Sequence, residues 1–149
     1  MKEKAFSKQI RDDIKALYPD AHVYLIQDSY RTGRKPYDFY VVLGENFMAF
    51  ECKVVKGKSV DVRCVTEKQI ASLKEVRDAG RCGVPFVAIH SDFYKRVFAY
   101  HINGWLNMID ELKVEKSILL VETIDYSMTT LPRIKIDNKL RWDVRRLMR

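Results

Sequence analysis

The chain has 149 residues, 47% of them hydrophobic and 32% charged, with 27 basic against 20 acidic side chains and a formal net charge of +7. This composition is typical of a globular protein and excludes an intrinsically disordered chain. The length favours a single domain, residues 1–149, whose core needs no disulfide or structural metal. The positive charge favours polyanionic partners such as nucleic acid, but it identifies no site.

The cysteine spacing and the hydropathy pattern provide evidence on the cellular location of the protein. Cys52, Cys64 and Cys82 show no CxxC spacing, so they indicate reduced thiols rather than a disulfide framework or a zinc site. The chain has no apolar run of membrane-spanning length and no signal peptide. We therefore expect a soluble cytoplasmic protein, in the host cytoplasm if the chain is viral, with no membrane partner.

The first predicted element is an amphipathic helix over residues 2–18. Phe6, Ile10 and Ile14 recur at helical spacing and define its buried face. Glu3 falls in the first turn, where a carboxylate interacts favourably with the helix dipole, and this structural role is sufficient to explain it on the sequence alone. The solvent-facing side is expected to carry Lys8, Arg11, Asp12 and Lys15.

A strand is predicted over residues 22–27, and the polar segment 28–35, DSYRTGRK, comes after it. This segment is basic and contains a tyrosine, which suits contacts with phosphates and unstacked bases. A solvated loop without a ligand is almost as compatible with the composition. Its position just before an acidic hairpin favours DNA contacts, which we assign to Tyr30, Arg31, Arg34 and Lys35.

The central feature is a β-hairpin predicted within residues 35–55, KPYDFYVVLGENFMAFECKVV. Two runs rich in aromatic and β-branched residues flank the turn-forming GEN. Side chains alternate along a strand, so Glu51 and Lys53 share one face of a largely buried strand and Cys52 occupies the other. Two opposite charges on a buried face require a reason, because burying a charge without a partner is costly.

Asp38 can join this pair, depending on the hairpin register. A two-residue loop at residues 45–46 sets Asp38 opposite Lys53, and a four-residue loop keeps that pairing. A three-residue loop would turn Asp38 to the other face unless a bulge restores it. In the productive register Asp38, Glu51 and Lys53 converge, giving two hard oxygen ligands for a divalent cation with an ammonium beside them. Ligand sets made only of oxygen favour Mg²⁺ or Mn²⁺ over zinc.

The segment after the hairpin, residues 56–65, is basic and irregular, and we include Lys56 and Lys58 among the predicted DNA contacts. Thr66 and Gln69 then have the spacing of a capping box that opens a helix. Gln69 thereby has a structural explanation, as the side chain that reaches back to the Thr66 amide.

The second half of the chain predicts strands over residues 84–90 and 96–101, a short helix over 105–112, and strands over 118–121 and 131–136. A final helix is expected after Asp137 or Asn138, with Leu140, Val144 and Leu147 facing inward. Its basic outer face is compatible with a solvated surface or with a second phosphate contact. The order of elements predicts an α/β fold with a central mixed β-sheet flanked by helices.

A glutamate two residues before a lysine is a common pattern. Glu111 and Lys113 have the same spacing as Glu51 and Lys53, but they lie in a helix-like segment with no strand-borne aspartate shortly upstream. The hairpin and Asp38 therefore distinguish the first pair from the second.

The sequence Pro36-Tyr37-Asp38 followed by Glu51-Cys52-Lys53 resembles the signature of the PD-(D/E)XK nuclease superfamily, with Tyr37 inserted between the proline and the aspartate. The helix TEKQIASL and the glycine-rich turn and strand AGRCGVPFVAIH come later in the chain, in the order found in Holliday junction resolvases of the RecU-like and Hjc-like groups. This resemblance covers residues 3–101. It implies a restriction-endonuclease-like α/β core.

The resemblance also implies roles for individual residues in the acidic cluster. Asp38 and Glu51 would be direct metal ligands, with the Cys52 carbonyl as a third. Lys53 would orient or deprotonate the attacking water, and Glu3 would complete the acidic set, through water.

Two polar residues outside this cluster also have counterparts in the family. Gln69 matches a glutamine that supports the metal centre in many members of the superfamily, so this role outweighs capping once the resemblance is considered. Ser29 lies where the Hjc-like group has a catalytically important serine, and we add it to the predicted DNA-binding residues.

The activity that the resemblance implies is that of a structure-specific endonuclease that resolves four-way DNA junctions by paired symmetrical nicks. It would depend on Mg²⁺, with Mn²⁺ as a substitute. A two-fold symmetric junction calls for a C2 homodimer, whose interface we expect on apolar faces of the second half.

Three other interpretations remain open from the sequence. The chain could be another nuclease of the superfamily, acting on flaps, ends or a specific duplex sequence. It could also be a nucleic-acid-binding module whose acidic residues are inert, or a basic α/β domain in which they form an ordinary ion-pair cluster.

Overall fold

The computed structural model describes residues 1–27, 35–80 and 82–148. Its centre is a six-stranded mixed sheet with the strand order β1-β2-β3-β5-β6-β8, in which β3 and β5 are parallel and the other neighbours antiparallel. This confirms the predicted fold class. The strands of the sheet are β1 (His22–Leu25), β2 (Phe39–Leu43), β3 (Asn46–Val55), β5 (Gly83–Ser91), β6 (Arg96–His101) and β8 (Thr129–Leu131).

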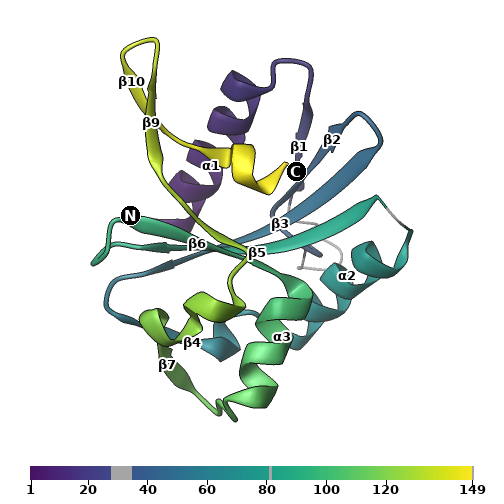
Figure 1. The fold of residues 1–149 in the computed structure, drawn as a ribbon. Coiled ribbons are helices and arrows are strands. Elements are labelled where there is room, and N and C mark those ends of the chain that lie inside the picture. The colour runs from purple at the N-terminus through teal and green to yellow at the C-terminus, as the bar shows by residue number, and fades with distance from the viewer. Residues whose placement is uncertain (28–34, 81, 149) are drawn as a thin grey trace.

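Helices cover both faces of the sheet (Figure 1). Helix α1 (Glu3–Leu17) lies on one face, and α2 (Glu67–Asp78) and α3 (Ile102–Glu111) lie on the other. Because β3 and β5 are parallel, the chain needs a crossover between them, and α2 supplies it. A small second sheet, β4 (Ser59–Asp61) with β7 (Ser117–Leu119), lies on the α3 side.

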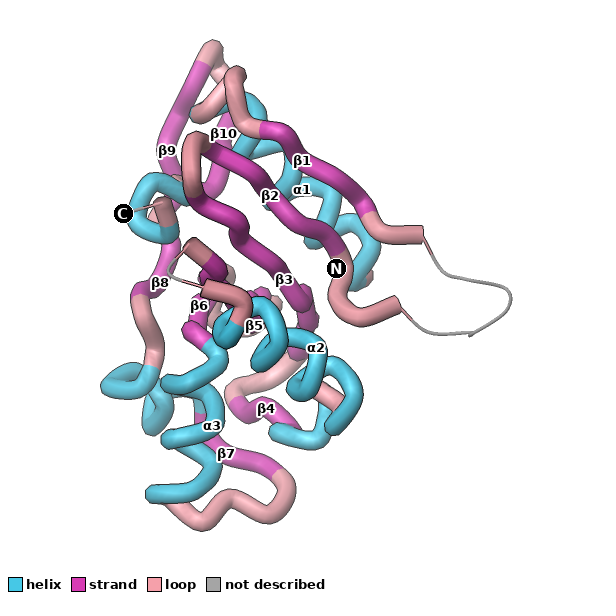
Figure 2. Tube along the Cα trace, turned by 90° about the vertical axis from the view of Figure 1, so that its right-hand side faces the viewer, coloured by secondary structure: helices cyan, strands magenta, loops and turns pink. Residues whose placement is uncertain are grey.

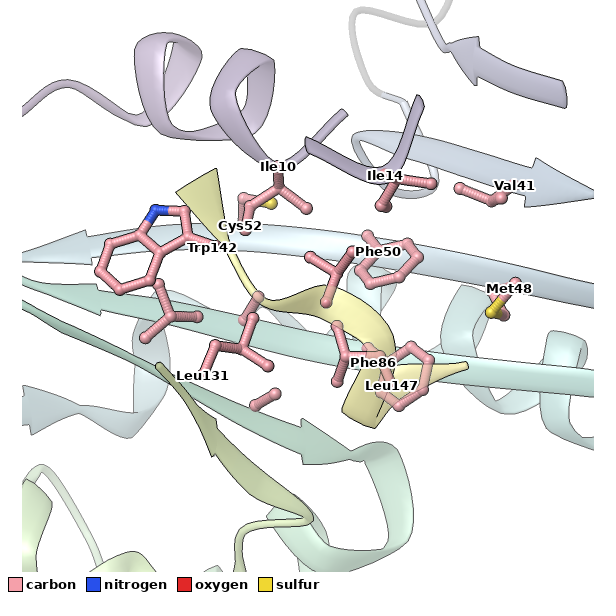
Figure 3. Packing of buried hydrophobic residues seen from close by; sticks show 14 of the residues in the cluster. Ile10, Ile14, Val41, Met48, Phe50, Cys52, Phe86, Leu131, Trp142 and Leu147 are labelled. Carbon is pink, nitrogen blue, oxygen red and sulfur yellow. The ribbon is translucent and has the colours of Figure 1, made fainter. Parts of the chain in front are cut away.

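The core is divided by the sheet into two clusters of buried residues. On the α1 side, Ile10 and Ile14 of α1 point toward Phe50 and Cys52 of β3, and Trp142 from the C-terminal segment packs into the same layer (Figure 3). The other cluster lies under α2 and α3. Residues of β3 alternate between the two clusters, as expected for a strand covered on both faces.

The first three strands run side by side (Figure 2), and their register differs from the predicted one in detail. Leu43 pairs with Asn46, so the two-residue loop is formed by residues 44–45 instead of 45–46. Gly44 takes a φ of +60°, a left-handed conformation that glycine adopts at little cost, and this places the turn one residue earlier. The prediction that Asp38 pairs with Lys53 was therefore wrong by two residues. A shift of two leaves every side chain on its predicted face.

Helix α2 begins with the predicted capping box. The Thr66 hydroxyl accepts from the backbone N–H of Gln69 at 3.2 Å, and the Gln69 side-chain oxygen accepts from the Thr66 N–H at 3.0 Å. Two backbone donors that the helix itself leaves unpaired are satisfied in this way.

The predicted C-terminal helix is wrong. Asp137 and Asn138 form the turn of a hairpin between β9 (Arg133–Ile136) and β10 (Lys139–Trp142), with φ values of 50° and 63°. Aspartate and asparagine tolerate the left-handed region better than most residues, and a pair of them is typical of two-residue hairpin loops.

A short 3-10 helix, Val144–Leu147, comes after this hairpin, and its apolar residues are buried. Leu140, predicted to face inward, is 62% exposed on the hairpin.

Two other segments of the second half are divided differently from the prediction. The predicted strand 118–121 is β7 followed by a 3-10 helix, Leu120–Tyr126. The predicted strand 131–136 is split between β8 and β9 at Pro132, which has no N–H to donate to a strand ladder. No helix in the described part of the chain is long and apolar enough to cross a membrane.

Candidate active site

The hairpin brings Asp38, Glu51 and Lys53 to one cleft of about 380 Å³. Phe39 and Phe50 are the last paired residues of β2 and β3, so Asp38 comes next on β2 and Glu51 next on β3, with their side chains on the same face. The cleft lies where β1 ends and β2 begins, and residues of α1 and of α2 both line it. The convergence predicted for an even-numbered loop is confirmed.

Asp38 is fixed by the backbone of β3. Its Oδ2 accepts from the N–H of Cys52 at 2.7 Å, and its own N–H donates to the Phe50 carbonyl at 2.9 Å. The carboxylate thus continues the pairing of β2 with β3 where the regular ladder has ended. Its other oxygen, Oδ1, lies 3.0 Å from the ammonium of Lys35.

Glu51 is buried, with 2% of its surface exposed. Its Oε1 lies 3.2 Å from Lys53 Nζ and accepts from Gln69 Nε2 at 3.0 Å. Its Oε2 is buried and has no hydrogen-bond partner in the described structure. Burial and the negative charge of Asp38 raise the pKa of Glu51 to about 7, against the opposing effect of Lys53.

Burial and the neighbouring carboxylates also affect the pKa of Lys53. Burial acts to lower the pKa of the Lys53 ammonium, but attraction to Glu51 and Glu3 and the hydrogen bond to Glu51 outweigh it, so the pKa is raised. Lys53 therefore stays charged at neutral pH and supplies a fixed positive charge within the cleft.

Gln69 makes a contact suited to each of the two roles that the sequence suggested, and its support of a metal centre stays a prediction. Its side-chain oxygen completes the capping box of α2, and its Nε2 donates to Glu51. Capping of α2 and support of Glu51 are thus compatible roles, because the oxygen of the amide makes the first contact and the nitrogen makes the second.

The cleft has features that a divalent cation requires. Mg²⁺ is held in proteins by one or two carboxylates, with water and substrate phosphate completing its shell. Asp38 and Glu51 supply two carboxylates, and Oε2 of Glu51 is a buried acceptor to which no described residue donates. Within the described residues no group of three or more His, Cys, Asp or Glu side chains lies close enough to hold a metal. The residues present fit a hard cation shared with a phosphate.

The backbone of Cys52 faces the same side. In a strand, the N–H and C=O of one residue point toward the same neighbouring strand, and the Cys52 N–H donates to Asp38. The Cys52 side chain lies in the hydrophobic core on the opposite face, where burial raises its pKa well above the ordinary value. Only its main chain can serve the cleft.

The other predicted site residues differ in their relation to the cleft. Glu3 begins α1 and lines the cleft, and Lys35 lines it as well. Lys56 and Lys58 lie beyond the end of β3 and do not line it; Lys58 Nζ lies 4.8 Å from the centre of the Phe93 ring. Ser29, Tyr30, Arg31 and Arg34 lie outside the described residues.

Sequence reasoning missed three cleft residues on α1. Lys4, Ser7 and Arg11 line the cleft, although Arg11 was predicted to face solvent. The available signal was the spacing of Glu3, Ser7 and Arg11, which recur every four residues and so form a polar stripe along one side of the helix. A polar stripe on a helix ordinarily faces solvent. Here it faces the cleft, which the sequence pattern does not reveal.

The second glutamate–lysine pair behaves as a control. Glu111 is the last residue of α3 and accepts from the Tyr126 hydroxyl, and Lys113 comes after the helix with a φ of 51°. Neither residue lines the cleft.

Comparisons with known proteins identify the family and the fold of the chain. The sequence model described as recombination protein U matches residues 2–142. Among solved structures, the chain is similar to Archaeoglobus fulgidus Hjc, a Holliday junction resolvase from an archaeal hyperthermophile. The TM-score is 0.53 and the identity 14%, with 81% of this chain and 93% of that chain covered, a level at which the likeness shows the fold alone. No curated protein matches the sequence.

Proposed function

The chain belongs to the recombination protein U family, a family of Holliday junction resolvases, and on this premise we propose that it cuts four-way DNA junctions by Mg²⁺-dependent hydrolysis of phosphodiester bonds, with Mn²⁺ able to substitute. The observation that carries the proposal is the shared cleft of Asp38, Glu51 and Lys53. In particular, Glu51 presents a buried oxygen with no partner within hydrogen-bonding distance in the described structure.

Asp38, Glu51 and the Cys52 carbonyl would hold the cation. When bound there, Mg²⁺ would offset the charge of the phosphodiester and lower the pKa of a coordinated water. Asp38 is suited to a ligand role because the Cys52 N–H holds one of its oxygens and thereby sets the direction of the other. The ion pair of that second oxygen with Lys35 indicates a position where a positive charge is already stabilised.

The other residues of the cleft would act on the phosphate and its attacking water. Lys53 is a charged ammonium beside Glu51, so it would orient the water by hydrogen bonding and stabilise the negative charge that develops on the phosphate. Gln69 would hold the Glu51 carboxylate in the ligating orientation. Glu3 would act through water, since it lines the cleft from α1 while Asp38 and Glu51 come from the sheet.

We propose a homodimer as the active form and a single nuclease domain over residues 1–149. A four-way junction has two-fold symmetry, and two symmetrical nicks need two active sites related by the same axis. The two hydrophobic clusters share one sheet, which supports one domain. Light scattering of the protein with and without junction DNA tests the oligomeric state; a monomer bound to a junction would contradict the dimer.

The activity is tested with end-labelled four-way junction, flap, linear duplex and single-stranded DNA, each incubated with Mg²⁺, Mn²⁺ or EDTA. We expect paired nicks in the junction with either metal and none in EDTA. Equal cutting of junction and linear duplex would point to another nuclease of the superfamily, and no cutting of any substrate would point to a binding module.

Two matched variants test whether the activity resides in the cleft. Glu51→Ala should reduce cleavage by about 10³-fold or more, because it removes a metal ligand. Glu111→Ala removes a glutamate with the same spacing to a lysine, outside the cleft, and should leave cleavage unchanged. If both variants keep wild-type activity, the cleft is not the active site.

A further inference from the structure

Two hydrogen-bond donors on α1 are buried at the cleft without an acceptor among the residues that the structure describes. Ser7 is 6% exposed, and its hydroxyl has no hydrogen-bond partner among the residues that the structure describes. The same holds for the buried Nε of Arg11, one helical turn further along. Both residues line the cleft that holds Asp38 and Glu51. Leaving a buried donor unpaired costs about 1–3 kcal/mol, and more for a charged group, so such groups need a reason.

The acceptors of the cleft do not satisfy these donors. Asp38 is engaged by Lys35 and the Cys52 backbone, and Glu51 by Lys53 and Gln69. Among the described residues, Arg11 forms no ion pair with either carboxylate. On the α1 side of the cleft, Ser7 and Arg11 thus offer donors that no described residue accepts from, while Asp38 and Glu51 offer carboxylates on the sheet side.

A second charged residue of α1 shows that this helix pairs its buried charges when they have a structural role. Asp13 accepts from Arg141 Nη1 at 3.0 Å and from the Trp142 N–H at 2.8 Å. Arg11 lies two residues away, and its Nε is buried without a partner in the described structure, as is the Nε of Arg141. The difference lies in the ion pair: Arg141 is held to Asp13 through Nη1, whereas Arg11 forms no ion pair with a described residue, so its guanidinium is available to an anion that is not part of the chain.

We propose that Ser7 and Arg11 form a subsite for a DNA backbone phosphate next to the one that is cut. A phosphodiester is an anion with two free oxygens, and a guanidinium with a neighbouring hydroxyl supplies matching donors in a fixed arrangement. Contacts of this kind position the substrate and carry no sequence information. The inference rests on the proposed function, because DNA is its ligand, and it extends the binding surface onto α1.

The main test compares Arg11→Ala with Lys8→Ala in binding to labelled four-way junction, with Ca²⁺ in place of Mg²⁺ to prevent cleavage. Lys8 is the matched control: it lies on the same helix, carries the same charge, is ion-paired to Asp12 and does not line the cleft. Arg11→Ala should weaken binding about tenfold or more and reduce the slope of log K against log salt by about 1. Lys8→Ala should change affinity less than about threefold. Equal losses in the two variants would overturn the proposal, since net charge alone would explain them.

Two more variants separate a specific contact from a folding defect. Arg11→Lys retains the charge but lacks Nε, so its affinity should fall between those of the wild type and Arg11→Ala. Ser7→Ala removes one neutral donor and should weaken binding about two- to fivefold. All variants are compared at temperatures where thermal unfolding shows them folded. Wild-type affinity in both Arg11→Lys and Ser7→Ala would overturn the subsite.

A direct probe distinguishes this inference from the proposed function. The Arg11 Nε–H resonance, assigned by its loss in Arg11→Lys, should shift when a short linear duplex is added in Ca²⁺, whereas that of Arg63, paired to Asp61 on the surface, should not. A protein that binds duplex through Arg11 but fails to prefer or cut junctions would retain the subsite and contradict the resolvase assignment. An unshifted Arg11 resonance at saturating duplex would overturn the subsite.

Discussion

The side chain of Gln69 joins the start of α2 to the buried carboxylate of Glu51. Its Nε2 donates to Glu51 Oε1 at 3.0 Å, while its Oε1 accepts from the backbone N–H of Thr66 at 3.0 Å. An amide has a donor end and an acceptor end, and here each end has one fixed partner. The helix cap holds the oxygen end of the Gln69 amide, so the nitrogen end is directed toward Glu51 in the cleft.

We predict that the two roles of Gln69 can be separated by mutation. Thr66→Ala removes the hydroxyl that caps α2 and should lower the free energy of unfolding by about 1 kcal/mol, with cleavage largely retained. Gln69→Glu keeps an oxygen for the Thr66 N–H but replaces the donor toward Glu51 by a negative charge. It should reduce cleavage by about tenfold or more near neutral pH while changing stability less than Gln69→Ala does.

Urea denaturation and junction cleavage, measured on the same preparations, check this prediction. If Thr66→Ala and Gln69→Glu lose activity and stability in the same proportion, Gln69 contributes to cleavage only through the stability of α2.

A second prediction concerns pH and the metal. Since the pKa of Glu51 is raised to about 7, a proton competes with the cation for this carboxylate below that pH. The affinity for Mn²⁺ should therefore rise as pH increases, by up to about tenfold per pH unit below pH 7, and level off above it. Calorimetric titration with Mn²⁺ between pH 5.5 and 8.5 measures this dependence. A pH-independent affinity over that range would contradict the raised pKa.

The same ionisation affects stability in the absence of metal. Glu51 holds its proton more tightly in the folded than in the unfolded protein, so the stability that this group contributes is complete below pH 4.5 and is lost as pH rises through about 7. In EDTA, the wild type should lose stability relative to Glu51→Gln between pH 5 and 7, by up to ~1 kcal/mol per pH unit. Urea denaturation of both proteins across this range tests the sign. A wild type that gains stability relative to the variant would contradict it.

Lys53 should influence both chemistry and metal binding. Lys53→Ala removes the ammonium from the cleft, so we expect cleavage to fall by about 10²-fold or more at every pH. It also removes the cation that lowers the pKa of Glu51, so Mn²⁺ binding should weaken near pH 7 and recover at higher pH. Cleavage and Mn²⁺ titration at pH 7 and pH 9 separate the two effects. Lys113→Ala is the control, because Lys113 comes after a glutamate at the same spacing but does not line the cleft.

The sequence predicted the sheet and the acidic hairpin because both depend on short-range patterns. Alternation along β3 assigned Glu51 and Lys53 to one face, and Cys52 to the other, without knowledge of the neighbouring strands. The face on which Asp38 lies depends only on whether the loop has an even or an odd number of residues. An error of two residues in the pairing therefore left Asp38 on the same face as Glu51 and Lys53.

The features that the sequence could not supply depend on contacts between distant segments. Asp137 and Asn138 suit a helix cap and a left-handed hairpin turn equally well as residue types, and the choice is made by packing of the C-terminal segment against α1. Arg11 was assigned to solvent because a charged residue on an amphipathic helix usually lies there. The burial of its Nε comes from the cleft beside β1 and β2, which no local pattern encodes.

The last prediction tests how the C-terminal hairpin is attached to α1. Asp13 is 5% exposed, and it pairs with Arg141 and with the backbone of Trp142, so Asp13→Ala would leave a partly buried charge and a buried N–H unpaired. We expect it to lower the free energy of unfolding by about 3 kcal/mol. The adjacent Asp12 forms an exposed ion pair with Lys8, and Asp12→Ala should cost about 0–1 kcal/mol.

Urea denaturation of the two variants provides the comparison, with each aspartate as the control for its neighbour. Because Asp13 lies one helical turn from Gln9, whose side chain accepts from the Trp142 indole at 3.4 Å, the loss should extend to the packing of Trp142 and be visible in its fluorescence. Equal and small effects of both substitutions would mean that β10 is held to α1 by its apolar contacts alone. A loss confined to Asp13→Ala would show that the buried carboxylate fixes the hairpin in place.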